Sequence, residues 1–268
     1  VIQKMTLFWL LPLICTERFI KNIYNFSHIG FFGIFIDQNV SWFYPVASAL
    51  VLTAGAICIW LIIKESGLEV KPKNIKIFIT ITALLIVFAS LYGGARHIVS
   101  CTIFGFALVL LYTASTLYHS FRKPRVKFIF KIIDHSCIYI LIAGTYTPFM
   151  LVAVRGALGW TFFGIVWGLT ALGILFKTFF IHRFQILSTL AYIAMGWLAI
   201  FAIKPIFQAL SGGAVFWLIA GGLAYTLGTI FYAWKKLPFN HAIWHSFVLA
   251  GSVCHFFAVL FYVIPLKT

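Results

Sequence analysis

Charged residues are scarce in this chain of 268 residues, and acidic residues are the scarcest. Only 9% of the residues are charged and 63% are hydrophobic, whereas about a quarter of the residues of a soluble domain are charged. No polar stretch between apolar runs exceeds about a dozen residues, which leaves no room for a large extramembrane domain. The sequence therefore excludes a soluble globular protein and predicts an all-α, polytopic membrane protein.

Two further classes of protein are disfavoured by what is missing. The five cysteines form no Cys-x-x-Cys pair, so neither a thiolate metal site nor a disulfide framework is indicated, and they are interpreted as small packing residues. The formal net charge of +15 is spread over short connections and not gathered in one tract, so we expect no nucleic-acid partner. Basic residues in short connections between membrane spans are better explained by their role in orienting the spans across the bilayer.

Long apolar runs recur along the chain. Runs of about 18 to 25 residues are long enough to cross a hydrocarbon core of about 30 Å. We expect residues 1–40 to form an interfacial or re-entrant lead-in and residues 41–268 to form one multi-span helical membrane domain. The eight predicted spans are 41–63, 77–94, 98–118, 128–154, 157–176, 186–203, 213–234 and 241–264.

The basic residues predict the orientation of these spans. Thirteen lie in one set of alternate connections and four lie in the other set and at the C-terminus. By the positive-inside rule the first set faces the cytoplasm and the C-terminus lies outside. The loops bearing Arg122 to Lys131 and Lys235-Lys236 are therefore expected to be cytoplasmic. The four residues of the other set are Arg96, Arg155, Lys204 and Lys267.

Polar residues gather at the expected cytoplasmic ends of three spans. His241 and His245 are four residues apart, so on a helix they share one face at a spacing that one metal ion can bridge. The orientation places this pair at the depth of Ser115 and His119, which end the span 98–118. Asp134 lies at the same depth and is the only one of the five acids inside a confidently predicted span, where an acid needs a partner.

Each of these residues also has a purely structural explanation. The two histidines of the last span can be hydrogen-bonded interfacial residues, Ser115 can bond its own helix, and Asp134 can cap the start of its span. Their common depth instead favours a zinc site. His119, His241 and His245 would supply three imidazoles and leave the fourth position open, as in catalytic zinc sites. Asp134 would then hydrogen-bond or deprotonate a water molecule, and Ser115 would orient it or stabilise an oxyanion.

The remaining histidines are weaker candidates as ligands. His135 follows Asp134 directly and points away from it on a helix, which favours a supporting or packing role. His255 is expected to bond a neighbouring helix, and His97 and His182 are expected in loops. Glycine and proline in 144–148 predict a kinked helix that packs closely against its neighbours.

Four segments of the sequence resemble the hemolysin III family, the bacterial branch of the progestin and adipoQ receptor superfamily. They are Ala-Ser-Thr-Leu-Tyr-His at 114–119, Asp-His at 134–135, Ile-Ala-Gly-Thr-Tyr-Thr-Pro-Phe at 142–149 and Asn-His-Ala-Ile-Trp-His at 240–245. The resemblance implies a seven-transmembrane-helix core with zinc held near the cytoplasmic face by one histidine of the second helix and two of the seventh. At the matching positions these are His119, His241 and His245, with Ser115 and Asp134 as companions.

The resemblance also implies a function. In the wider superfamily, which includes alkaline ceramidases, such a site suits hydrolysis of a lipid amide. We therefore expect an integral zinc protein of the bacterial cytoplasmic (inner) membrane that hydrolyses lipid amides or esters, with membrane lipids as its partners. One alternative is a receptor-like or membrane-homeostasis protein with structural zinc. A pore-forming hemolysin is disfavoured, because the polar residues gather at one end of the helices.

The N-terminal part departs from the family pattern. Bacterial members open their first helix with paired acids, an asparagine and a Ser/Thr-His-Gly stretch. The nearest counterpart here, Glu17 together with Asn25 to His28, lies far upstream of the span it should join. The run 41–63 is therefore expected to be an extra span ahead of the seven, with a divergent replacement of the first helix as the alternative.

Overall fold

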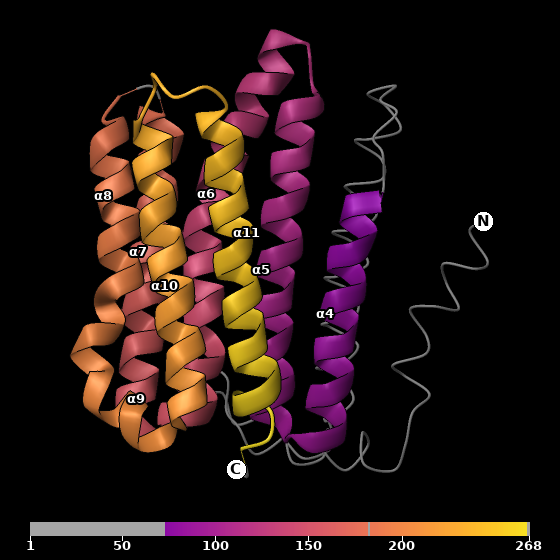
Figure 1. Cartoon of the computed structure of the whole chain (residues 1–268), viewed down its shortest axis with the longest axis vertical. Coiled ribbons are helices and arrows are strands. Elements are labelled where there is room, and N and C mark those ends of the chain that lie inside the picture. Colours follow the sequence, from indigo (N-terminus) through magenta and orange to yellow (C-terminus); the bar gives the residue numbers. More distant parts are fainter. Residues whose placement is uncertain (1–72, 182, 267–268) are drawn as a thin grey trace, which may run out of the picture.

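The computed structural model describes residues 73–181 and 183–266, and every regular element in them is helical. Six helices of this part are long and apolar enough to cross a membrane, and a shorter apolar segment, Ile79–Tyr92, precedes them. The helices run side by side along the long axis of the molecule (Figure 1). The protein is a polytopic membrane protein, as predicted. The expected lead-in 1–40 and extra span 41–63 lie outside the described residues.

The seven predicted spans from residue 77 onward each correspond to a helix or a helix with a distorted end. The elements are α4 (Lys73–Tyr92), α5 (Ala95–Ser120), α6 (Pro124–Pro148), η3 (Phe149–Val154), α7 (Gly156–Phe180), α8 (Gln185–Gly196), η4 (Trp197–Ala202), α9 (Ile203–Ala209), α10 (Gly212–Ala233), α11 (Asn240–Ala258) and η5 (Val259–Val263). Helices α4, α5, α7 and α10 are uninterrupted, whereas α6 and α11 end in π-helices and α8 continues through a 3-10 helix into α9.

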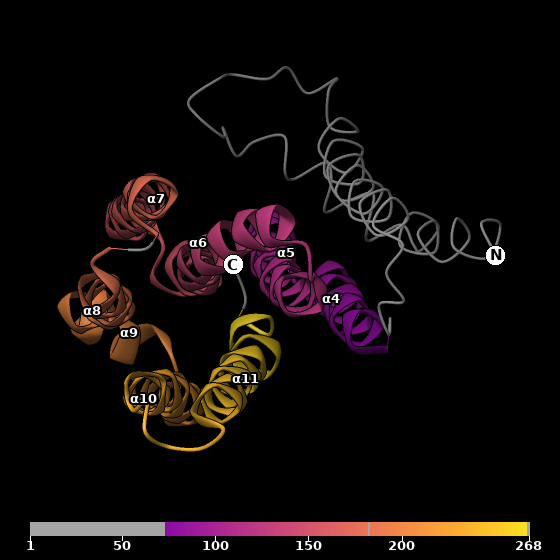
Figure 2. The ribbon, with the colours of Figure 1, turned by 90° about the horizontal axis from the view of Figure 1, so that it is seen from above.

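Six of the seven helical segments surround a common centre, and α4 packs on the outside of α5 (Figure 2). Helices that follow one another in the chain pack together, chiefly α10 with α11, α5 with α6, and α4 with α5. The most hydrophobic stretch of Pro124–Val154 is 78% buried, whereas that of Gln185–Ala209 is only 17% buried. Helix α6 is therefore the most buried member of the ring, while α8 and α9 form a wall with an apolar outer surface.

Gly144 permits the close contact between α6 and α5. A Cβ atom at this position would lie 2.6 Å from the Cβ of Ala107 on α5, so only glycine fits, as is usual where membrane helices approach closely. After Pro148 the helix widens into η3, in which the Arg155 N–H donates to the carbonyl of Met150 at 2.9 Å. The close packing expected around 144–148 is confirmed, and the helix continues beyond Pro148 as a π-helix.

The segment from α8 to α9 is broken where a uniform helix was expected. The hydroxyl of Tyr146, on α6, donates to the Gly196 carbonyl at 2.7 Å and accepts from the Ala199 N–H at 2.7 Å. This side chain enters the hydrogen-bond ladder of the neighbouring helix, a known cause of helix distortion. The helix resumes as α9, so Lys204 lies in a helix and not in a connection.

The prediction that His97 lies in a loop is wrong. Helix α5 begins at Ala95, directly after the Gly93-Gly94 turn, and includes both Arg96 and His97. The Nδ1 atom of His97 accepts the N–H of Gly94 at 3.0 Å and thereby caps the first turn. A Cβ on Gly93 would lie 2.5 Å from the His97 Cβ, so this glycine makes the tight turn possible, and the His97 side chain is completely buried.

Candidate metal centre

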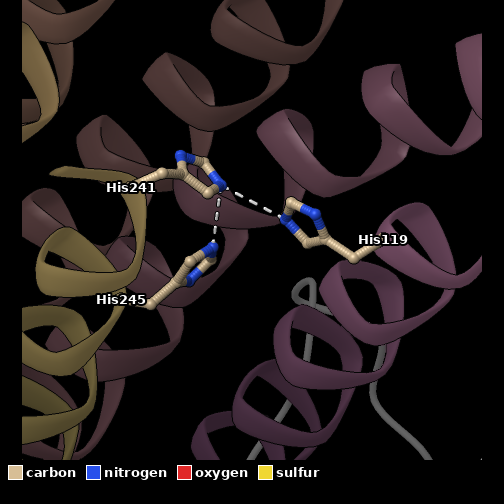
Figure 3. A group of neighbouring side chains, drawn as sticks. All are labelled: His119, His241 and His245. Carbon is tan, nitrogen blue, oxygen red and sulfur yellow. Dashed lines mark hydrogen bonds between the residues drawn. The ribbon is translucent and has the colours of Figure 1, made fainter. Parts of the chain in front are cut away.

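Three histidines from two helices converge at one end of the bundle. Figure 3 shows His119 of α5 facing His241 and His245 of α11. The Nε2 atom of His241 lies 3.2 Å from Nε2 of His119 and 3.1 Å from Nε2 of His245. One possible ligand atom from each residue lies within 4.8 Å of the others. The structure thus brings together the three residues that the sequence singled out as metal ligands.

The local fold explains this convergence. Helix α11 begins at Asn240, so His241 and His245 occupy its first two turns and share one face. The ring of Trp244 packs against both, with centroid separations of 5.3 and 4.5 Å. His119 lies in the last turn of α5. The end of one helix therefore meets the start of another.

Hydrogen bonding alone leaves this cluster poorly satisfied. The Nε2 atom of a neutral imidazole either carries one hydrogen or offers one lone pair, whereas Nε2 of His241 has two nitrogen neighbours at hydrogen-bonding distance. A cation accepts all three lone pairs. Tetrahedral zinc, with Zn–N bonds of about 2.0–2.1 Å, sets its ligand nitrogens about 3.3–3.4 Å apart, close to the separations observed. The residues present therefore fit a nitrogen-bound zinc ion, and this donor set disfavours magnesium or calcium.

Asp134 and Ser115 face each other beside this cluster. Both are buried, with exposed fractions of 5% and 9%, and the Ser115 hydroxyl lies beside the Asp134 carboxylate. Helix α6 begins at Pro124, so Asp134 lies ten residues inside it. The alternative that Asp134 caps this helix is therefore wrong.

His135 and His255 are held by backbone groups. Nδ1 of His135 donates to the carbonyl of Lys131 at 2.8 Å, and lies 3.6 Å from the Asp134 carboxylate. His255 bonds through Nε2 to the carbonyl of Leu218 on α10 at 3.1 Å, which confirms that it bonds a neighbouring helix. His182 lies outside the described residues.

A central cavity of about 210 Å³ opens beside the candidate metal centre. Its walls are mostly apolar and come from α5 to α11, the usual character of a small-molecule pocket. Polar and ionisable side chains join the lining near the histidine cluster. These are Ser115, Asp134, His135, Lys177, His241 and His245.

Lys177 is the functional candidate that sequence reasoning missed. It directly follows the predicted span 157–176 and is therefore expected in a connection, but it lies in the last turn of α7 and only 2% of it is exposed. A signal was available, because Phe179, Phe180 and Ile181 continue the apolar run beyond it.

Comparison with known proteins gives consistent matches. Residues 74–256 match the family model described as "Haemolysin-III related". The chain is 54% identical over 202 residues to the "Hemolysin-3 homolog" of Bacillus subtilis, which covers 75% of this chain and 95% of that protein. It is 52% identical over 205 residues to "Hemolysin-3" of Bacillus cereus, which covers 76% of this chain and 94% of that protein.

A more distant similarity extends to animals. The human "Monocyte to macrophage differentiation factor" is 26% identical over 167 residues, which covers 60% of this chain and 69% of that protein. This match supports the superfamily expected from the motifs, whereas no solved structure matches the chain. The chain belongs to the haemolysin III family of membrane proteins.

Proposed function

We propose that this protein is a zinc-dependent hydrolase of membrane lipid amides or esters. The observation that carries the proposal is the convergence of His119, His241 and His245 beside an apolar cavity whose wall also contains Asp134 and Ser115. Zinc held by three imidazoles supplies Lewis-acid activation of a carbonyl group and of water. An apolar cavity next to such a site suits a substrate with a hydrocarbon chain.

The protein's own side chains have complementary roles in this reaction. The Asp134 carboxylate accepts a proton from the attacking water, whose oxygen bonds to the carbonyl carbon, and returns that proton to the amine or alcohol that leaves as the C–N or C–O bond breaks. The Ser115 hydroxyl, which contacts this carboxylate, orients it or donates to the developing oxyanion. Both groups are buried, which excludes competing bulk water.

The distribution of basic residues supports a cytoplasmic location for the site. The connections α5–α6, α7–α8 and α10–α11 lie at the same end of the bundle as the histidine cluster (Figure 1). They carry Arg122, Lys123, Arg183, Lys235 and Lys236. By the positive-inside rule this end faces the cytoplasm, and the similarity to Bacillus proteins is consistent with a bacterial cytoplasmic membrane.

Metal analysis combined with a lipid assay tests the proposal. Purified wild-type protein is expected to contain about one zinc per chain and to release fatty acid from a panel of ceramides, other N-acyl lipids and phospholipids. The double variant His241→Ala, His245→Ala should lose both the zinc and the fatty-acid release. The control variant Lys236→Gln, at an exposed position in the connection between α10 and α11, should keep both. Folded wild-type protein without metal would contradict the proposal.

A second candidate is a non-enzymatic, receptor-like or membrane-homeostasis protein in which zinc has a structural role. Helix α5 packs mainly on α4 and α6, and α11 packs mainly on α10, whereas the histidine cluster bridges α5 and α11. A metal ion here would hold the first and last helices of the ring together. This candidate predicts that a chelator lowers the melting temperature while wild-type protein releases no fatty acid from any lipid of the panel.

A further inference from the structure

Lys177 places a buried cation in the wall of the central cavity. It lies in the last turn of α7, is 2% exposed, and lines the same cavity as Asp134 and His241. An ammonium group removed from water is costly unless an anion or several hydrogen-bond acceptors compensate for the lost hydration. The groups around Lys177 therefore need to be considered one by one.

The part of the chain that the structure describes offers Lys177 no carboxylate. Asp134 is the only acid in that part, and its one ion-pair contact within 4 Å is with His135, at 3.6 Å. Lys177 instead has its Nζ atom 5.8 Å from the centre of the Tyr192 ring. Two side chains of α6, those of Lys131 and His135, lie near enough to interact electrostatically with Lys177. Among the described residues the ammonium group therefore has a basic neighbour and no acidic one, which favours an anion in the cavity.

The cavity itself indicates what kind of molecule carries that anion. Its lining is mostly apolar, with side chains such as Leu141, Ile142 and Phe149. Polar side chains at the start of α8, Gln185 and Thr189, line it as well, and α8 follows α7 directly in the chain. A ligand that fits both the apolar lining and the polar lining near Lys177 has an anionic group at one end and a hydrocarbon chain at the other.

We propose that Lys177 binds the carboxylate or phosphate group of an anionic amphiphile whose hydrocarbon chain lies in the central cavity. The lysine is on α7, whereas the candidate zinc ligands are on α5 and α11. The subsite therefore depends neither on a bound metal nor on hydrolysis, and it can be tested separately from the proposed function.

Binding of matched probes to the full chain in detergent tests this subsite. The probes are dodecyl phosphate, palmitate, the neutral dodecanol and inorganic phosphate. Calorimetry and the shift in the protein's melting temperature measure how tightly each probe binds. Since a charge-assisted hydrogen bond contributes more than a neutral one, wild-type protein should bind dodecyl phosphate roughly 10- to 100-fold more tightly than dodecanol. Inorganic phosphate alone should bind far more weakly than dodecyl phosphate.

Variants at Lys177 distinguish this interaction from a general effect of charge. Lys177→Gln should bind dodecanol as before and lose the preference for dodecyl phosphate, whereas Lys177→Arg should keep most of it. Lys236→Gln, which removes an exposed charge, should behave as the wild type does. The preference should also persist in the His241→Ala, His245→Ala variant, so a failure of the zinc proposal would leave this one standing.

Any of the following results would overturn the proposal. One is equal affinity of wild-type protein for dodecyl phosphate and dodecanol. Another is an unchanged preference in folded Lys177→Gln, or its loss in the histidine double variant, which would assign the anion to the metal centre. The third is inorganic phosphate binding as tightly as dodecyl phosphate, which would exclude an amphiphile.

Discussion

Two groups of histidines in this protein differ in what their ring nitrogens contact: main-chain groups in one, and other imidazoles in the other. His97 and His255 are buried, with exposed fractions of 0% and 7%, and each uses a ring nitrogen to bond a main-chain group. His97 accepts the Gly94 N–H, and His255 bonds the Leu218 carbonyl. These contacts connect a helix to its own first turn or to a neighbouring helix, so both residues are structural.

The second group consists of His119, His241 and His245, whose Nε2 atoms face one another. They lie at the edge of the bundle, where His119 is exposed and the other two are half-buried. The difference teaches that helical spacing and residue type do not separate a structural histidine from a ligand. The two kinds of histidine differ in whether the ring nitrogen faces a main-chain group or another imidazole. The following predictions test that distinction, from the largest expected effect to the smallest.

Asp134→Asn should have the largest effect, on turnover. The amide has nearly the same shape as the carboxylate but cannot accept the proton, so fatty-acid release should fall by about 10²–10⁴-fold. Zinc content should stay at the wild-type value, because Asp134 is not among the three clustered candidate ligands. Fatty-acid release by chromatography and metal content by mass spectrometry measure the two quantities. Release close to the wild-type rate would remove Asp134 from the mechanism.

His119→Ala should sharpen the comparison directly. Loss of a ligand is expected to weaken zinc binding by more than about 100-fold, since changes in groups that only support ligands already cost 10- to 100-fold. His255→Ala is the matched control, because it removes a buried histidine whose ring nitrogen bonds the Leu218 carbonyl. It should retain zinc and only melt at a lower temperature. Competition with a zinc chelator measures both variants, and equal zinc loss in the two would contradict the distinction.

Gly221→Ala tests the structural role of His255 without changing any histidine. A Cβ at Gly221 would lie 2.3 Å from Cδ2 and 2.4 Å from Nε2 of His255, so the ring must shift and the protein should lose about 1–3 kcal/mol of stability. The adjacent Gly222→Ala is the control, because nothing lies within 4 Å of its added Cβ. Thermal unfolding in detergent compares the two. A destabilisation of the same size in both would show that the ring contact is unimportant.

Tyr146→Phe should have the smallest effect and extends the comparison to another side chain that bonds main-chain groups. The hydroxyl bonds the Gly196 carbonyl and the Ala199 N–H at the break between α8 and η4. Its loss should lower stability by about 1 kcal/mol, because both backbone groups can partly re-form helical bonds. Zinc content should not change. The melting temperature is the measurement, and a change in zinc content would contradict a purely structural role.

Much of the fold could be predicted from local properties of the sequence. Apolar runs and basic connections predicted the seven helical segments from α4 to α11, with most ends within a few residues of those observed, because the length of a span follows from the thickness of the bilayer. The errors have two causes. Tyr146 of the neighbouring helix α6 bonds the main chain where α8 ends, and the tight Gly93-Gly94 turn lets α5 begin early enough to include His97.

The sequence by itself determined which residues are candidates for chemistry. His241 and His245 share a face by helical spacing alone, and the scarcity of acids singles out Asp134. Only the tertiary structure decided which of these groups meet, because the approach of α5 to α11 depends on the packing of the whole ring. It also decided that Lys177 belongs to the cavity and not to a connection, since burial depends on side chains that are distant in the chain.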